Sequence, residues 1–255
     1  RHGVPDIRLD SDESKDKLDL AGKNVLLTFG LINRNKGIET VLRALPDVIE
    51  RFPETRYIIL GKSHPAVLRL FGENYRNHLE KIVTENNLQD HVRFVNRFVS
   101  SEELHEYLSA ADILITPYLN EAQVSSGPLS FALGADTALV STPFWHALEL
   151  LADGRGKIFN FRDYKRLSEI LIDLLGNPDE LLSIKRKSLN FGKRILWPLT
   201  GQDYLSLVHT ELKESTREKI DKKPVKSPAY PKISFRHIFN LTDPTGIISD
   251  AKYGF

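Results

Sequence analysis

A stretch after one apolar run joins small polar residues to a glycine and a proline. It reads QVSSGPLSFALGAD, and Ser125, Ser126, Gly127 and Pro128 mark the change from polar to apolar residues. Serine is a common helix N-cap, proline suits the first helical turn, and glycine lets a ligand approach the backbone. Unpaired amide groups at such a helix start attract an anion. The stretch therefore predicts either an anion site or an ordinary capped helix with nothing bound.

Two cations follow another apolar run, in the sequence FGLINRNKGIET. Gly30 ends the run, and Arg34 and Lys36 stand just before Gly37. If both apolar runs are parallel strands, their carboxyl ends lie at the same edge of a sheet, where ligands of open α/β sheets bind. An arginine and a lysine fixed there would neutralise a phosphate held by the serine–glycine turn. Solvated loop cations are the alternative interpretation.

Six short apolar runs alternate with stretches of helical period along the chain. The runs are residues 24–30, 56–61, 92–98, 112–118, 138–142 and 157–161. They are apolar on both faces, as expected for parallel strands that helices cover on both sides. The pattern predicts an α/β fold: a doubly wound, six-stranded parallel Rossmann-like sheet with C-terminal helices and an extended tail.

Helices are predicted at residues 37–52, 100–111, 163–176, 178–195 and 200–214. The third of them ends on Gly176, which predicts a left-handed helix stop, and Tyr204 is expected to anchor the closing helices. The following sequence is charged and proline-rich, which is typical of a linker. The predicted organisation is a hinge or linker at 1–22, one domain at 23–214, and a linker with the start of a further segment at 215–255.

The composition narrows the classes of function. Lys+Arg 35 and Asp+Glu 34 nearly cancel, so no chain-wide basic surface for nucleic acid is expected. The absence of cysteine excludes thiolate chemistry and fits a reducing, cytoplasmic compartment. No apolar run has the length of a transmembrane segment, and the charged first twenty residues do not resemble a signal peptide. The absence of Met leads us to expect a fragment or a processed chain.

The ordered motifs resemble the C-terminal, donor-binding domain of GT-B glycosyltransferases, in particular retaining enzymes of the kind found in glycosyltransferase family 4 (glycosyl transferases group 1). The resemblance is carried by FGLINRNKGIETVLRALP, YIILGKSHP, DHVRFVNRFVSSEELHEYLSAADILITPY and ALGADTALVSTPFWHALELLADGRGKIFNFRDYKRLSEIL. RHGVPD resembles the close of the N-terminal domain of such enzymes, so a missing N-terminal GT-B domain is an expected partner. Neither a P-loop nor a G-x-G-x-x-G dinucleotide fingerprint occurs.

The resemblance implies that the full-length protein is a hexosyl-type glycosyltransferase. It would transfer a sugar from a nucleotide-sugar, such as a UDP- or GDP-sugar, to a carbohydrate-type acceptor with retention. Lys36, helped by Arg34, would be catalytic by holding the donor diphosphate, and the amides at Ser125–Gly127 would hold it from the other side. The base would lie near Gly61 and Arg97. No cofactor and no metal are expected, because cations and a helix start take the metal's role.

Several positions match or depart from the donor site of that family. Gly30 matches its first glycine, and Glu149 matches an acid near the donor. The E-x7-E motif corresponds here to Gln123 and Phe131. Gln123 can still bind sugar hydroxyls, but a phenylalanine cannot accept a hydrogen bond from the ribose. Either the ribose is held otherwise, with Ser130 as the candidate, or the donor binds differently, or turnover has been lost.

These departures keep two alternatives open. One is a non-catalytic binding module on the same fold. The other is a GT-B protein that resembles sugar-nucleotide epimerases, for which the sequence offers no evident carboxylate or histidine dyad. The fragment alone is expected to bind nucleotide weakly and to be inactive, because it lacks the acceptor half.

Overall fold

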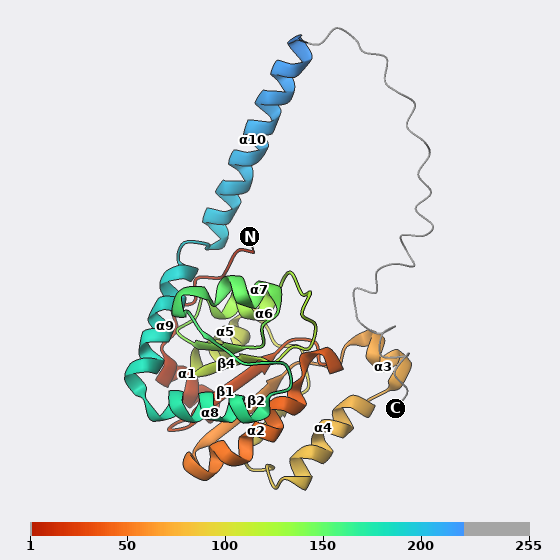
Figure 1. The fold of residues 1–255 in the computed structure, drawn as a ribbon, viewed down its shortest axis with the longest axis vertical. Helices are drawn as coiled ribbons and strands as arrows, with labels where there is room; N and C mark the ends of the chain where they lie inside the picture. The colour runs from red at the N-terminus through yellow and green to blue at the C-terminus, as the bar shows by residue number, and fades with distance from the viewer. Residues whose placement is uncertain (1, 222–255) are drawn as a thin grey trace. The chain divides into compact units, whose positions relative to one another are not determined.

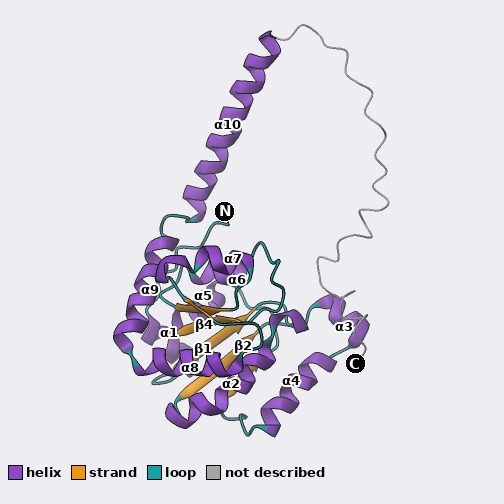
Figure 2. Ribbon diagram, viewed as in Figure 1, coloured by secondary structure: helices purple, strands orange, loops and turns teal. Residues whose placement is uncertain are grey.

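The computed structural model describes residues 2–221, with side chains described as far as Leu212, and it confirms the predicted sheet. All six strands pair in parallel in the order β3-β2-β1-β4-β5-β6. Figure 2 shows strands of this sheet in orange, among the purple helices. They are β1 (Asn24–Phe29), β2 (Thr55–Leu60), β3 (Val92–Val95), β4 (Ile113–Thr116), β5 (Ala138–Ser141) and β6 (Lys157–Ile158). The chain order reverses between β1 and β4, and such a switch point opens a crevice at the carboxyl edge of the sheet.

Helices cover both faces of the sheet, as the apolar runs predict (Figure 1). Alternate residues of β1 enter different cores: Leu26 packs with α2, α4 and α8, whereas Leu27 packs with α5, α6 and α7. The α-helices are α1 (Ser11–Lys17), α2 (Ile38–Arg51), α3 (Pro65–Phe71), α4 (Asn74–Glu85), α5 (Ser101–Ala110), α6 (Gly127–Ala132), α7 (Trp145–Leu150), α8 (Tyr164–Gly176), α9 (Pro178–Gly192) and α10 (Trp197–Asp221). Helices α1, α3, α4 and α7 were not predicted from the sequence.

The N-terminal segment packs on the sheet domain instead of forming a free linker. Val4 and Leu20 are fully buried, and the Ile7 amide donates to the Gly134 carbonyl at 3.1 Å. Helix α1 is fastened to the sheet because Lys15 Nζ lies 2.8 Å from the Asp112 carboxylate. The compact unit therefore includes residues 2–22, which corrects the predicted start at 23. That this segment leads from a further domain stays a prediction.

Helix α8 ends at Gly176 as predicted, but the predicted left-handed conformation of this glycine is wrong. Gly176 is the last residue of α8 and has no positive φ. The first residue outside the helical conformation is Asn177 (φ −128°, ψ 84°). Pro178 follows directly, and a proline disfavours the helical conformation of the residue before it. Asn177 then caps α9 by accepting a hydrogen bond from the Glu180 amide at 3.2 Å.

The C-terminal boundary also differs from the prediction. The compact unit that contains the sheet ends at Leu199, and α10 continues to Asp221, past the predicted end at 214. Tyr204 lies on α10, where it is 56% exposed, and its expected role as an anchor of the closing helices stays a prediction. The segment predicted after residue 221 lies outside the described residues.

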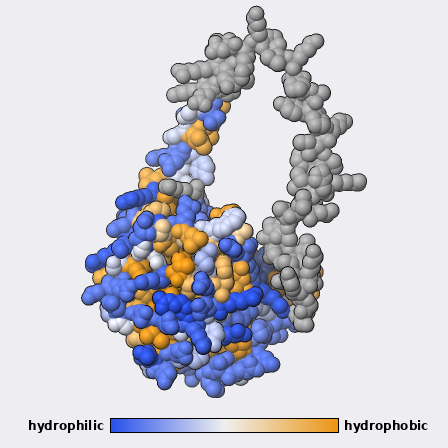
Figure 3. All heavy atoms as spheres, viewed as in Figure 1, coloured by the Kyte–Doolittle hydropathy of each residue, from blue (hydrophilic) through white to orange (hydrophobic). Residues whose placement is uncertain are grey.

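Polar and apolar residues are interspersed over the visible face of the molecule (Figure 3). Within residues 2–221, no helix combines the length and the apolar character needed to span a membrane.

Candidate functional site

The turns that follow β1 and β4 meet at the switch point of the sheet. We call residues 31–37 the lysine turn and Ser125–Gly127 the serine turn. The loop after β4 is bound to the lysine turn, because the Leu119 amide donates to the Asn35 carbonyl at 2.9 Å. Gly37 has φ +60°, and a Cβ added there would lie 2.1 Å from the Pro117 carbonyl oxygen. The backbones therefore approach so closely that only glycine fits at position 37.

Gly30 lies between the lysine turn and the start of α6. A Cβ added to Gly30 would be 3.3 Å from Lys36 Nζ and 3.5 Å from Pro128 Cγ. Gly61, directly after β2, packs still more tightly against Gly30, since a Cβ added to it would lie 2.0 Å from the Gly30 carbonyl oxygen. Both glycines have positive φ, +117° and +138°. The structure thus brings four of the predicted site elements together: two glycines, the lysine and the first turn of α6.

The Lys36 ammonium is held by a tyrosine that the sequence analysis did not select. Lys36 Nζ donates to the Tyr118 hydroxyl at 2.7 Å and lies 4.0 Å from the centroid of its ring. Tyr118 is 1% exposed and stacks on Phe144, with ring centroids 5.2 Å apart. The half-buried Lys36 therefore points at a rigid aromatic support, whereas Arg34, in the 3₁₀ turn Arg34–Lys36, is exposed. The position of Tyr118 at the end of the predicted fourth strand was the signal available in the sequence.

The serine turn caps α6 as predicted, but one of its amides is already paired. Ser126 Oγ accepts a hydrogen bond from the Leu129 amide at 3.2 Å. The Ser126 amide donates to His146 Nδ1 at 3.0 Å. The expectation that the amides of Ser125–Gly127 are available together is therefore wrong for Ser126. Burial lowers the pKa of His146, while the charge of Glu149 opposes this shift.

The residues matched to the E-x7-E motif have internal partners. Gln123 Nε2 donates to the Ser125 carbonyl at 3.0 Å. The Phe131 ring lies 6.4 Å from the ring of His2. Ser130 is 1% exposed, and its Oγ has no hydrogen-bond partner among the described residues. Gln123 and Phe131 thus contact other residues near the serine turn. Ser130 follows the turn in α6 and carries a buried hydroxyl without a hydrogen-bond partner among the described residues.

Arg97 and Glu149 lie exposed at the surface. Arg97 forms a bidentate ion pair with Glu103 at the start of α5, with Nη1 at 2.6 Å from Oε2, and this hydrogen bond raises the pKa of Arg97. A nucleobase near Arg97 would have to compete with this carboxylate. Glu149 lies on α7, where its backbone carbonyl accepts from Arg155 Nη2 at 2.9 Å.

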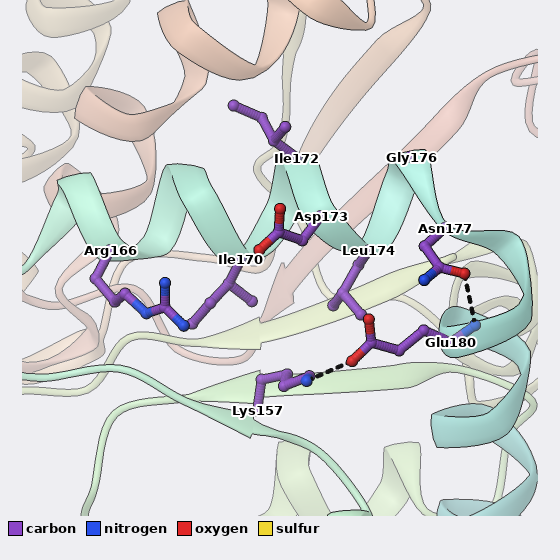
Figure 4. A pocket seen from close by; sticks show the side chains of 9 residues that line it. All are labelled: Lys157, Arg166, Ile170, Ile172, Asp173, Leu174, Gly176, Asn177 and Glu180. Atoms are coloured by element: carbon purple, nitrogen blue, oxygen red, sulfur yellow. Dashed lines mark hydrogen bonds and ion pairs between the residues drawn. The ribbon is translucent and has the colours of Figure 1, made fainter.

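A hollow of about 400 Å³ lies away from these turns, between the start of β6 and helices α8 and α9 (Figure 4). Its lining contains an ion pair between Lys157 and Glu180 at 2.5 Å and includes none of the predicted donor residues. No group of three metal-ligating side chains occurs among the residues that the structure describes.

Comparison with known proteins identifies one family and several relatives. The family described as "Glycosyl transferases group 1" matches residues 10–191. Spore coat protein SA of Bacillus subtilis is 24% identical over 206 residues, which cover 77% of this chain and 51% of that protein. Alpha-monoglucosyldiacylglycerol synthase of Streptococcus pneumoniae is 26% identical over 199 residues, 75% of this chain and 42% of that enzyme. The chain thus spans about half the length of the curated relatives it matches.

Solved structures share the fold. The C-terminal domain of a glycosyl transferase group 1 family protein from Francisella tularensis superposes with a TM-score of 0.64 at 18% identity, covering 73% of this chain and 92% of that domain. HepE of Anabaena in complex with UDP gives a TM-score of 0.69 at 18% identity, over 79% of this chain and 52% of that protein. The predicted fold, a Rossmann-like half of the GT-B type, is therefore confirmed.

Proposed function

Because the chain belongs to the glycosyl transferases group 1 family, we propose that it is the donor-binding half of an enzyme that transfers a hexosyl group from a nucleotide-sugar with retention. The observation that carries the proposal is the convergence of Lys36 and the first turn of α6 on Gly30. A diphosphate placed beside Gly30 would meet an ammonium group and a helix start, both of which stabilise negative charge.

The chemistry follows from the charge that develops as the sugar leaves. When the bond between the anomeric carbon and the diphosphate oxygen breaks, negative charge accumulates on the departing nucleoside diphosphate. Lys36 would stabilise this charge, and it is already oriented by Tyr118, so little reorganisation is needed. Arg34, in the same turn, would supply a second positive charge. On the other side, the serine turn would contribute the amides of Ser125 and Gly127.

The donor is proposed to be a UDP- or GDP-sugar and the acceptor a carbohydrate-type molecule bound by an additional N-terminal domain. HepE of Anabaena has been solved with UDP and with UDP-glucose. A relative from Corynebacterium glutamicum is named as a GDP-mannose-dependent mannosyltransferase. These proteins support a nucleoside diphosphate as the shared part of the ligand, with Gly61 and Arg97 as the proposed neighbours of the base. Metal-independent transfer in a cytoplasmic setting remains a proposal.

A non-catalytic module is the second candidate, and the packing of Phe131 favours it. The family places a carboxylate at the position of Phe131. Here the phenylalanine ring lies near the ring of His2, and it supplies no acceptor for a ribose hydroxyl. The two candidates differ in turnover. A full-length protein that releases nucleoside diphosphate in the presence of an acceptor would exclude the module.

Calorimetric titration of the 255-residue chain with UDP, GDP, UDP-glucose and GDP-mannose tests donor binding directly. We expect weak, saturable binding of one diphosphate series. The absence of heat with all four ligands would contradict the proposal, provided that the chain is shown to be folded by its circular dichroism and cooperative melting.

A further inference from the structure

A histidine on α7 accepts a hydrogen bond from the backbone of the serine turn. His146 is 9% exposed, and its Nδ1 accepts the hydrogen bond of the Ser126 amide at 3.0 Å. Two backbone bonds join the same segments, from the Trp145 amide to the Glu121 carbonyl at 3.0 Å and from the His146 amide to the Gln123 carbonyl at 3.2 Å. The start of α7 is thus fastened to the loop before α6 at three points.

Only one of these three bonds depends on a side chain. A backbone N–H can donate but cannot accept, so His146 Nδ1 must carry no proton when the bond forms. The bond therefore requires the neutral imidazole with its proton on Nε2. An imidazolium at this position would present N–H to N–H, and the buried Ser126 amide would lose its partner, which is unfavourable.

We propose that His146 is a positioning residue for the serine turn, in which the unprotonated Nδ1 fixes the Ser126 amide and thereby sets the direction of the neighbouring Gly127 amide. The part of this role that concerns the donor rests on the proposed function. The hydrogen bond itself can be tested without any donor.

Among the described residues, two charged or titratable groups act on the ionisation of His146: Glu149 lies on the same helix, and His2 lies in the N-terminal segment. Glu149 favours the imidazolium, whereas burial and His2 disfavour it, and burial has the largest effect on the pKa of His146. The balance maintains the neutral form that the Ser126 amide requires.

Two substitutions separate the acceptor atom from the volume of the ring. His146→Leu retains apolar volume and removes the acceptor, while His146→Asn places an amide oxygen at nearly the position of Nδ1. We expect the Ser126 amide to exchange with solvent roughly 5-fold faster in His146→Leu and at nearly the native rate in His146→Asn, because a lost hydrogen bond costs about 1 kcal/mol. Hydrogen exchange followed by ¹⁵N NMR measures this rate, and ring ¹⁵N shifts report the tautomer.

The same variants test whether the turn matters for the ligand. Calorimetry with UDP should show affinity reduced roughly 5- to 10-fold in His146→Leu and rescued in His146→Asn.

Unchanged Ser126 exchange in His146→Leu, or an Nδ1–H tautomer in the native chain, overturns the proposal. Altered exchange with unchanged UDP affinity overturns the donor part. If the native chain binds no UDP, the proposed function fails, while the exchange data still decide the role of His146. Should His146→Leu not fold, the pH dependence of Ser126 exchange in the native chain decides it.

Discussion

The lysine turn and the serine turn lie at the same switch point, but different forces fix their shapes. In the lysine turn, a Cβ at Gly37 would lie 2.1 Å from the Pro117 carbonyl oxygen, so close backbone packing determines the conformation. At Gly127 in the serine turn, an added Cβ meets no atom within 4 Å. The serine turn is instead held by hydrogen bonds, including the one to His146. One turn is therefore rigid through steric contact, and the other is adjustable through single side chains.

The polar groups of the two turns also have different kinds of partner, an aromatic side chain in one turn and a histidine in the other. The ammonium of Lys36 rests on Tyr118, whose ring is immobilised by stacking on Phe144. The amide of Ser126 rests on an imidazole that can gain a proton. The amide side should therefore respond to pH through the protonation of His146, whose pKa is lowered by burial.

The largest difference should appear when a methyl group is added to each turn. Gly37→Ala should lower the free energy of unfolding by about 2 kcal/mol or more, because Ala is strained at φ +60° and clashes with Pro117. Gly127→Ala should change it by less than about 1 kcal/mol, since its position is open. Denaturant unfolding of both variants measures these values. Equal destabilisation would show that the two turns are not fixed by different forces.

The open space at Gly127 also sharpens the donor proposal. If the diphosphate approaches this turn, the methyl group of Gly127→Ala will occupy part of its site. UDP affinity should then fall although stability does not. Unchanged affinity would place the diphosphate away from the serine turn.

Removal of the ammonium is expected to have the next largest effect. Lys36→Gln should weaken UDP binding roughly 10- to 150-fold, because hydrogen bonds to charged groups contribute about 1.5–3 kcal/mol. Lys81→Gln is the matched control, since Lys81 lies on α4 with its side chain 71% exposed and pairs with Glu85 only at 3.5 Å. Calorimetry of both variants gives the comparison. Equal losses would indicate general charge attraction instead of a site at Lys36.

Removal of the support beneath Lys36 should have a smaller effect. Tyr118→Phe retains the stacking on Phe144 and removes the hydroxyl that Lys36 contacts at 2.7 Å. We expect UDP affinity to fall roughly 2- to 10-fold, as for a lost neutral partner, with little change in melting temperature. An increase in affinity would mean that Tyr118 withholds the ammonium from the ligand.

The sequence predicts this fold well because each strand carries its own signal. The strand around Leu26 and Leu27 is apolar on both faces, and both faces are buried. The approach of Lys36 and of Pro128, in the first turn of α6, to Gly30 could also be predicted, because parallel strands place their following turns at one edge. The helix end at Gly176 was predicted correctly, but its left-handed conformation was not, because Pro178 disfavours the helical conformation of Asn177 and so ends the helix without a left-handed glycine.

The contacts that hold Lys36 and Ser126 in place could not be predicted, because they depend on packing between segments that are distant in the sequence. Tyr118 and Lys36 are 82 residues apart, and Ser126 and His146 are 20 apart. Nothing in the local pattern of either residue specifies the partner. Likewise, the pairing of Arg97 with Glu103 competes with a ligand role that its position alone suggests.

The smallest expected effect is the pH dependence of stability that His146 contributes. Burial lowers the pKa of His146 in the folded protein below its ordinary value of 6.5, so between these two pKa values the unfolded chain binds more protons than the folded one. The contribution of the neutral histidine to stability is therefore complete above pH 6.5 and is lost as the pH falls through the folded pKa. Denaturant unfolding at several pH values between 5 and 7.5 should show a shallower slope in His146→Asn than in the native chain. Because the other histidines are common to both proteins, identical slopes would mean that His146 does not titrate differently on folding, and the serine turn would then not respond to pH through this residue.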